Sequence, residues 1–480
     1  MVKILGTKVL GAFKKNWHLS LVVLLFAVSA WLRFADLGFS DFYGDETKTF
    51  YLDKTVPASQ FFLNQRKGPI QFFVVWGAEK IIGGHHELYT RIPFAAAGFL
   101  SVVVFYFLIR KIFNPTTALI STFLFSISGF SLAFSRTIQY QSFLTLFGLL
   151  AILLFLYYLE TGKWRWMIFS AVSLGLAFYS HYDAVFYAVP VFYLLINSKK
   201  PEGYSLKKFL LYFVAPFVVF ASLFYIPYFV NGYFQEHTTG YLTRRLEGGS
   251  FALNNSSFTF FVYNPSMWFF VALLFGLYGF FERKADGKVR LFIFWFLAAF
   301  IMFQFVFLNP GTHILNYFVP LYALVGYGVY RIFMLMPSKI LRRVYILVLG
   351  VLGGYLLAFN ANIYVPSLSA GYPWNFYEEQ EYHLFLYGFP YNRSWREVGE
   401  YVGELDGVRG IYTNDNDTIA EYYLHGVDYT PPGANFTPQY YVHVFNSQEF
   451  NSDDGISENY EKVEGFDGAI LYKLKSGVED

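Results

Sequence analysis

The sequence contains no cysteine, and charged residues are scarce. Among 480 residues, Asp, Glu, Lys and Arg together make up 15%, whereas soluble domains carry about 25%. The absence of cysteine excludes a disulfide framework, a thiolate metal site and a cysteine nucleophile. The low charge excludes a disordered chain, a coiled coil and most cytosolic enzymes. The net charge of +2 gives no sign of a nucleic-acid partner.

Apolar residues, by contrast, are abundant and come in long blocks. They make up 55% of the chain, and aromatic residues alone make up 22%. A membrane helix needs about 20 apolar residues, and lipid leaves such a block no alternative to the helix. We therefore predict a polytopic α-helical membrane protein with about eleven transmembrane helices, near residues 17–36, 92–109, 116–135, 142–159, 166–180, 184–197, 209–230, 259–281, 291–308, 314–334 and 343–364.

Lysine and arginine predict the orientation of these helices, because they concentrate in cytoplasmic loops. With the N-terminus inside, the short cytoplasmic segments hold 20 basic residues. The short outer loops after residue 91 hold only three: Arg136, Arg244 and Arg245. We therefore expect an integral protein of the cell membrane with a cytoplasmic N-terminus and its C-terminal segment outside.

The first apolar block has two interpretations. Val28-Ser29-Ala30 resembles a signal-peptide cleavage site, but the apolar block continues past it through Trp31 and Leu32. This continuation favours a retained anchor. Both interpretations place the following loop outside.

Two segments are too polar to span the membrane. Residues 37–91 form an outer loop in which we expect juxtamembrane helices, and residues 366–480 form a tail of ordinary soluble composition. We therefore divide the chain into a transmembrane domain, 1–365, and a soluble extracytoplasmic α/β domain, 366–480. In this tail we expect a helix with a capping box at 394–397, a helix at 418–424 with Asp417 as its N-cap, and strands at 408–412, 440–445 and 469–474.

Ionisable residues near the ends of the spans gather on the outer side, apart from the basic inner loops. Such residues are costly at a membrane boundary unless they are paired or hydrated, so they indicate a candidate functional site. The members of this set are Asp45, Glu46, Lys48, Lys67, Arg136, His181, Asp183 and His313.

Asp45 and Lys48 lie three residues apart and share a face if the segment is helical. A cation beside a carboxylate keeps the carboxylate ionised at neutral pH, so that Asp45 can accept a proton from an attacking hydroxyl. The alternative is a helix N-terminus with Asp45 in its first turn and Lys48 as a surface partner. Spacing alone favours this alternative.

Lys67-Gly68-Pro69 opens an apolar, aromatic run, and Pro suits the first turn of a helix. The run, residues 70–76, suggests a helix that lies in the membrane interface. Lys67 has two possible roles: it extends toward phospholipid headgroups, or it binds one specific lipid phosphate as a point charge.

The remaining members of the set have structural alternatives. Arg136 can anchor the end of a span, His181 and Asp183 can bond each other, and His313 can cap a helix. His85-His86-Glu87 lacks the spacing of metal ligands on a helix. No metal-ligand set stands out, so the sequence requires no cofactor; it leaves the use of a divalent metal open.

The order of these motifs resembles the GT-C superfamily of membrane glycosyltransferases. It is most similar to the branch that holds the protein O-mannosyltransferases and the lipid A aminoarabinose transferases. The resemblance covers about residues 15–330. Its matching motifs are Gly44-Asp45-Glu46-Thr47-Lys48, Lys67-Gly68-Pro69, Arg91-Ile92-Pro93, Ser135-Arg136, and Gly175-Leu176-Ala177 running to His181. Two positions depart from the family pattern: Gly68 stands where Pro usually follows the Lys, and Gln141 stands where the mannosyltransferases have Asp.

The resemblance implies an inverting enzyme that transfers a sugar from a polyprenyl-phosphate donor to an extracytoplasmic acceptor, which can be a glycan, a lipid or a protein hydroxyl. It implies that Asp45 is the base that activates the acceptor and that Glu46 supports it. The candidate residues for the donor phosphate are Lys48, Lys67 and Arg136. The candidate substrate-binding residues are Arg91, His181, Asp183 and His313.

Two other classes of protein compete with an enzyme. A transporter or flippase of lipid-linked glycans usually has ionisable residues near the bilayer midplane and inverted repeats, whereas the predicted spans here are nearly free of charge and show no repeat. A structural or sensory protein leaves the 45–67 loop unexplained. The outer tail can bind the acceptor or a partner protein, or it can shield the site.

Overall fold

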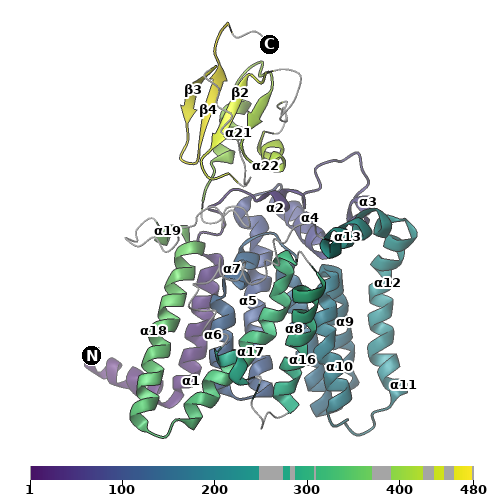
Figure 1. The fold of residues 1–480 in the computed structure, drawn as a ribbon, viewed down its shortest axis with the longest axis vertical. Coiled ribbons are helices and arrows are strands. Elements are labelled where there is room, and N and C mark those ends of the chain that lie inside the picture. The colour runs from purple at the N-terminus through teal and green to yellow at the C-terminus, as the bar shows by residue number, and fades with distance from the viewer. Residues whose placement is uncertain are drawn as a thin grey trace.

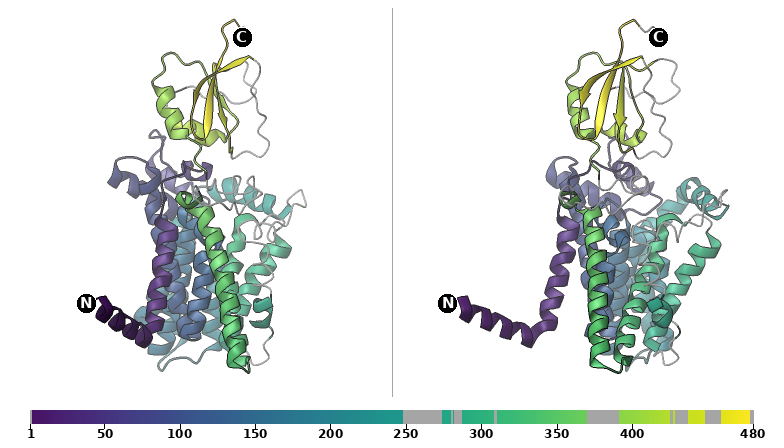
Figure 2. Two further views of the ribbon diagram at one scale, coloured as in Figure 1. Left: turned by 90° about the vertical axis from the view of Figure 1, so that its left-hand side faces the viewer. Right: turned by 60° about the vertical axis from the view of Figure 1, so that its left-hand side comes forward.

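The computed structural model is a bundle of long helices with a small sheet-containing unit at one end (Figure 1). It describes residues 2–247, 274–279, 281, 287–307, 310–369, 391–424, 427, 437–447 and 459–477. Two further views show the sheet beyond the same end of the bundle, and the N-terminus at the opposite end (Figure 2). We call the end that carries the sheet the outer end.

Among the residues that the structure describes, seven helical segments are long and apolar enough to cross a membrane, or eight if one bent pair is counted as a span. The chain is therefore an integral membrane protein. The bundle consists of α1 (Val2–Phe34), α5 (Glu87–Ile112), α6 (Pro115–Ile127), α7 (Gly129–Arg136), α8 (Gln141–Thr161), α9 (Trp164–Ser180), α10 (Val185–Asn197), α11 (Leu206–Phe209), π-helix η2 (Leu210–Val214), α12 (Ala215–Val230), α16 (Gly287–Ile301), π-helix η4 (Met302–Val306), α17 (Leu315–Leu335) and α18 (Lys339–Tyr364).

The eleven predicted spans differ from these helices in three places. The block at 116–135 forms α6 and α7, which meet at an angle of 56° around Ser128, where the backbone is extended. The blocks at 166–180 and 184–197 form α9 and α10, which are shorter than the other spans. Most of the block at 259–281 lies outside the described residues.

Short helices cover the outer end of the bundle (Figure 1). Within the predicted outer loop, α4 forms where the apolar run after Lys67 predicted a juxtamembrane helix. Gly83 ends it in the left-handed conformation (φ +89°). The elements at this end are α2 (Gly44–Thr47), α3 (Ala58–Leu63), α4 (Ile70–Ile82), η1 (Tyr182–Ala184), η3 (Phe234–Thr239), α13 (Gly240–Glu247), η5 (Gly311–Ile314) and α19 (Pro366–Ser369).

Within the described ranges of the C-terminal part, the sheet has four strands in the order β1-β2-β4-β3, with β1 parallel to β2 and the other neighbours antiparallel. Two helices pack beside it, and Trp395, Val398 and Val402 on one helical face enter its core. The elements are α21 (Trp395–Gly403), β1 (Ile411–Thr413), α22 (Asp417–Tyr423), β2 (Tyr440–Val444), β3 (Tyr460–Gly465) and β4 (Ala469–Leu474).

The helices of this unit begin differently from the prediction. Ser394 does not form a capping box, because its φ of +60° turns it away from the first turn, and its hydroxyl accepts a hydrogen bond from Gly468 N–H at 3.2 Å. Asn416, rather than Asp417, is the N-cap of α22. Strand β3 was not predicted, because its side chains are largely exposed and charged.

Hydrogen bonds fix this unit on the outer loop. Asp41 accepts from the backbone N–H groups of Arg393 and Trp395, at 3.1 and 3.0 Å. The Tyr423 hydroxyl accepts from Phe42 N–H at 2.8 Å and donates to Glu87 at 2.7 Å. The sheet unit and the loop that carries α2 therefore have a defined relative position.

Candidate functional site

Glu46 anchors the short helix α2 to the bundle. Its carboxylate is fully buried and accepts two hydrogen bonds from the Arg91 guanidinium, at 2.6 and 2.9 Å. It also accepts from the backbone N–H groups of Ile138, at 2.8 Å, and Tyr43, at 2.7 Å. Because these contacts join α2 to the start of α5 and to the α7–α8 junction, they fix the neighbouring residue, Asp45.

Asp45 is the carboxylate of α2 that remains accessible, with a side chain 37% exposed. It lies 3.4 Å from the Lys48 ammonium, 3.7 Å from the Lys67 ammonium and 3.4 Å from the Gln139 amide. Burial acts to raise the pKa of Asp45, but the charges of Lys67 and Lys48 outweigh it and hold the pKa below its usual value. Asp45 is therefore ionised at neutral pH, as the sequence predicts.

Asp45 faces a polar cavity of about 230 Å³ at the outer end of the bundle, which we call the cation cavity. Four cations line it against this one carboxylate, so the wall carries three positive charges in excess. Such a wall favours an anionic ligand. Its lining residues are Tyr43, Asp45, Arg66, Lys67, Phe134, Gln139, Tyr140, Gln141, His181, Tyr241, Arg244, Arg245, Thr312 and His313.

Tyr241 on α13 organises the arginines of the cavity. The Arg66 guanidinium lies 3.7 Å from the centre of its ring, and those of Arg245 and Arg244 lie at 5.0 and 5.7 Å. Its hydroxyl is 2.9 Å from His313 Nε2. Burial acts to raise the pKa of Tyr241, but His313 and Arg245 lower it to about 8. An acidic hydroxyl of this kind is a strong hydrogen-bond donor to an anion.

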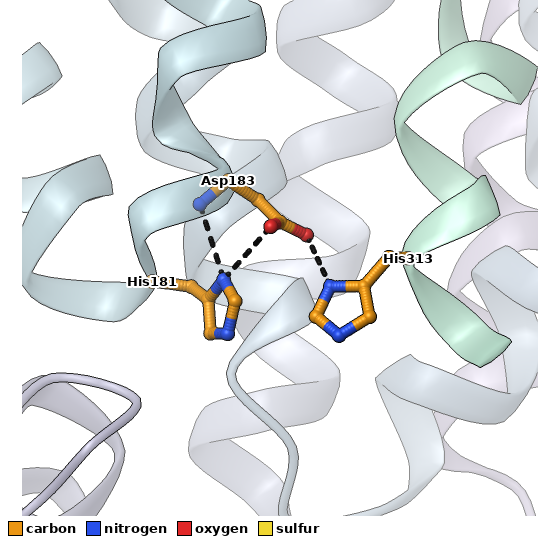
Figure 3. A group of neighbouring side chains, drawn as sticks. All are labelled: His181, Asp183 and His313. Carbon is orange, nitrogen blue, oxygen red and sulfur yellow. Dashed lines mark hydrogen bonds and ion pairs between the residues drawn. The ribbon is translucent and has the colours of Figure 1, made fainter. Parts of the chain in front are cut away.

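His181, Asp183 and His313 lie close together (Figure 3), and the two histidines line the cation cavity. The Asp183 carboxylate is 3.1 Å from His181 Nδ1 and 2.7 Å from His313 Nδ1, and it accepts a hydrogen bond from Asn316 at 2.7 Å. One ligand atom from each of the three residues lies within 4.8 Å of the others. A divalent metal that assists this protein would find suitable ligands here. In the structure, His313 and Asn316 contact the Asp183 carboxylate, and His181 Nδ1 accepts a hydrogen bond from the Asp183 N–H at 3.1 Å.

An apolar cavity of about 140 Å³ adjoins the cation cavity. The two cavities share Tyr241, Arg245 and His313. Asp183 and Tyr182 also line it, and the rest of its wall is apolar and includes Phe186 and Phe303. The junction therefore offers positive charge on one side and apolar surface on the other, which is the polarity of a lipid phosphate.

Some predicted site residues do not line the cation cavity. Glu46 and Arg91 are buried against each other. Arg136 is 1% exposed and donates to the carbonyls of Leu32 and Asp36, at 2.8 and 3.1 Å. It therefore joins α7 to the end of α1. This contact fits the alternative in which Arg136 anchors the end of a span. Lys48 pairs with Asp45 from outside the cavity, and Asp183 lines the apolar cavity instead.

Four residues of the site were not predicted from the sequence: Arg66, Tyr241, Arg244 and Arg245. Arg244 and Arg245 did carry a signal, because they are two of the three basic residues in the short outer loops. An exception to the positive-inside pattern could have marked them as functional. Arg66 and Tyr241 had no such signal, because only the fold brings them together.

Gly68 allows Lys67 to reach Asp45. Its φ of +107° lies in the region that favours glycine, and an added Cβ would lie 2.2 Å from the carbonyl oxygen of Tyr179. The backbone after Lys67 therefore packs directly on the end of α9. This close approach gives a structural reason for Gly68 at the position where the related motif has Pro.

We expect Gly68→Ala to lower the free energy of unfolding by about 1–3 kcal/mol, because alanine is strained at this φ and collides with α9. Gly77→Ala on the adjacent α4 is the matched control, since nothing lies within 4 Å of the added Cβ. The control should be neutral or stabilising by up to about 1 kcal/mol. Thermal unfolding in detergent measures both, and equal stability of the two variants would contradict the role assigned to Gly68.

The chain is similar to known proteins both in part of its sequence and in its overall fold. Residues 66–228 match the family model described as "Dolichyl-phosphate-mannose-protein mannosyltransferase". A curated relative, YkcB of Bacillus subtilis (strain 168), is named as a candidate mannosyltransferase and is 25% identical over 195 residues. That alignment covers 38% of this chain and only 26% of YkcB.

Solved structures share the fold along nearly the whole chain. ArnT from Cupriavidus metallidurans in its apo state superposes with a TM-score of 0.59 at 13% identity, covering 94% of this chain and 97% of ArnT. The Archaeoglobus fulgidus oligosaccharyltransferase gives a TM-score of 0.51 at 15% identity and covers 89% of this chain and 61% of that protein. These findings confirm the resemblance to the GT-C membrane glycosyltransferases and show their fold.

Proposed function

We propose that the chain is an inverting glycosyltransferase that moves a sugar from a polyprenyl-phosphate-linked donor to a hydroxyl of an extracytoplasmic acceptor. The observation that carries the proposal is one ionised carboxylate, Asp45, at the edge of a cavity with four cations. The cavity lies at the end of the bundle that we infer to be extracytoplasmic. A membrane-embedded reaction with an anionic leaving group needs this combination of base and positive charge.

In this reaction the acceptor oxygen attacks the anomeric carbon of the donor sugar while Asp45 takes the hydroxyl proton. The bond between that carbon and the phosphate oxygen breaks, and polyprenyl phosphate leaves with the bonding electrons. A single displacement inverts the anomeric centre. Every charge in this scheme is met by the chain itself, so the proposal requires no further cofactor.

Lys67 and Arg245 are the cations that we assign to the donor phosphate. Lys67 reaches the cavity beside Asp45, and Arg245 lies where the cation cavity meets the apolar one. The phosphate would lie between them with its polyprenyl tail toward Phe186 and Phe303. The structure of ArnT bound to undecaprenyl phosphate, which superposes on this chain with a TM-score of 0.56, supports a lipid-phosphate ligand.

We expect Lys67→Ala and Arg245→Ala each to weaken undecaprenyl phosphate binding about 10- to 100-fold, because each removes a charge-assisted hydrogen bond. Native mass spectrometry of the detergent-solubilised protein measures the affinity. Lys80→Ala is the matched control, because Lys80 is exposed on α4 and does not line the cavity. Equal affinity of all four proteins would refute the assignment of the phosphate to this cavity.

The pH profile of transfer tests the electrostatic role of Lys67. Since the pKa of Asp45 is held below its usual value of 3.8, the ionised base persists through the mildly acidic range, and activity is lost only as the pH falls below that value. Lys67→Met removes the larger of the two stabilising charges and raises this pKa. We therefore expect the acid limb of the profile of kcat against pH, measured at saturating donor, to move to higher pH in this variant. An unmoved limb would contradict the pairing of Asp45 with Lys67.

A further inference from the structure

A second polar cavity, of about 490 Å³, lies between the outer loop and the sheet unit. We call it the interdomain cavity. Its volume is within the range of about 300–1,000 Å³ that is typical of small-molecule sites. The lining residues are Thr47, Lys48, Phe50, Tyr51, Leu52, Asp53, Val56, Gln60, Phe61, Asn64, Gln65, Thr418, Glu421 and Tyr422.

Nearby residues of the same two segments line the two polar cavities, which share no lining residue. Along one segment, Asp45 lines the cation cavity, whereas Thr47 and Lys48 line the interdomain cavity. Along the other segment, Gln65 lines the interdomain cavity and Lys67 lines the cation cavity. Because Lys48 also pairs with Asp45 at 3.4 Å, the proposed base lies between the two cavities.

The interdomain wall presents polar groups that are available to a ligand. Within the described part of the chain, the side chains of Gln60, Asn64 and Glu421 are exposed and have no hydrogen-bond partner. Tyr51 and Tyr422 add aromatic rings to this wall. The hydrogen bonds that dock the sheet unit, such as that between Tyr423 and Phe42, keep the two walls together.

This wall fits a saccharide better than a peptide. Amide and carboxylate groups can each bond two neighbouring hydroxyls, and aromatic rings pack against the apolar face of a sugar. An extended peptide, by contrast, is usually recognised by an exposed strand edge. The lining residues come from α2, α3, α22 and the intervening loop, and none of them lies on a strand.

We propose that the interdomain cavity binds the acceptor, and that the acceptor is a saccharide whose reacting hydroxyl reaches Asp45 past Lys48. This inference rests on the proposed function for the identity of the ligand as acceptor. The cavity recognises the sugar units, whether the saccharide is free or attached to a lipid or protein. The sheet unit thereby supplies part of the acceptor site through Thr418, Glu421 and Tyr422 of α22.

Saturation-transfer NMR on the full chain tests the site directly, with maltotriose, mannotriose and chitotriose as probes. The detergent must lack a sugar headgroup, such as lauryldimethylamine oxide, because a maltoside would compete. We expect at least one trisaccharide to receive saturation from the wild type. We expect the double variant Asn64→Ala, Glu421→Ala to bind that trisaccharide about tenfold or more weakly, because it removes two hydrogen-bonding groups.

Two controls separate this site from the rest of the protein. Ser59→Ala, on the same helix as the lining residue Gln60 but outside the cavity, should bind the trisaccharide like the wild type. The double variant should keep wild-type affinity for undecaprenyl phosphate, because that ligand is assigned to the cation cavity. If the chain turns over no donor while trisaccharide binding still depends on Asn64 and Glu421, the proposed function fails and the saccharide site stands.

Three outcomes would overturn the inference. The first is no saturation transfer to any of the three trisaccharides. The second is equal binding by the wild type and the double variant. The third is a serine- and threonine-rich peptide that binds in their place and depends on Asn64 and Glu421, which would assign the cavity to a protein acceptor.

Discussion

Asp45→Asn is expected to reduce kcat for sugar transfer by about 10²- to 10⁴-fold, the usual contribution of a general base. Asparagine keeps the shape of the side chain and its contact distance to Gln139, but it cannot take the acceptor proton. Affinity for undecaprenyl phosphate should not fall, because the substitution removes a negative charge from beside Lys67. Steady-state transfer and lipid-phosphate binding, measured on the same preparation, separate these two effects.

Glu160→Gln is the matched control for this variant. Glu160 also pairs with a lysine, Lys111, but at the opposite end of the bundle, so its loss should leave kcat unchanged. If Asp45→Asn retains more than about a tenth of wild-type kcat, Asp45 is not the base. Asp183 then becomes the next carboxylate to test, because it lies near the cation cavity through His313.

Glu46→Ala should have the largest effect on stability, lowering the free energy of unfolding by about 3–5 kcal/mol. The substitution leaves the Arg91 guanidinium buried without its counter-charge, which is the costly way to break a buried pair. It also leaves the Ile138 N–H without its acceptor. Thermal unfolding in detergent, followed by circular dichroism, measures the loss.

The exposed ion pair between Glu160 and Lys111 is the control for the loss of stability expected of Glu46→Ala. Glu160 is 57% exposed on its side-chain surface, and surface pairs contribute about 0–1 kcal/mol. Glu160→Ala should therefore change stability far less than Glu46→Ala. Similar losses in the two variants would mean that the buried pair with Arg91 does not anchor α2.

The sequence predicted the features that depend on local patterning. Apolar length identified most of the membrane helices, and the run after Lys67 predicted α4, because backbone in lipid has few alternatives to the helix. The helical spacing of Trp395, Val398 and Val402 also predicts that they share one face of a helix. Periodicity could not predict the bend at Ser128 or the positive φ of Ser394, because tertiary contacts decide both.

The site was only partly predictable for a similar reason. Asp45 and Lys67 lie in motifs, and their distance of 3.7 Å follows once the outer loop folds. The resemblance named Asp45 as the base and Glu46 as its support, but spacing could not show that Glu46 is buried against Arg91 while Asp45 remains accessible. Nor could it place Arg245 in the same cavity as Lys67, because the two residues are 178 positions apart in the chain.

The most direct test of the central claim is the release of polyprenyl phosphate from polyprenyl-phosphate-linked sugars by the purified protein. The wild type and Lys67→Ala are compared, with membrane extract added to supply the acceptor. We predict release by the wild type and a strong reduction in the variant, because the cation cavity must hold the leaving phosphate. No release from any donor would contradict the glycosyltransferase account and favour transport of lipid-linked glycans.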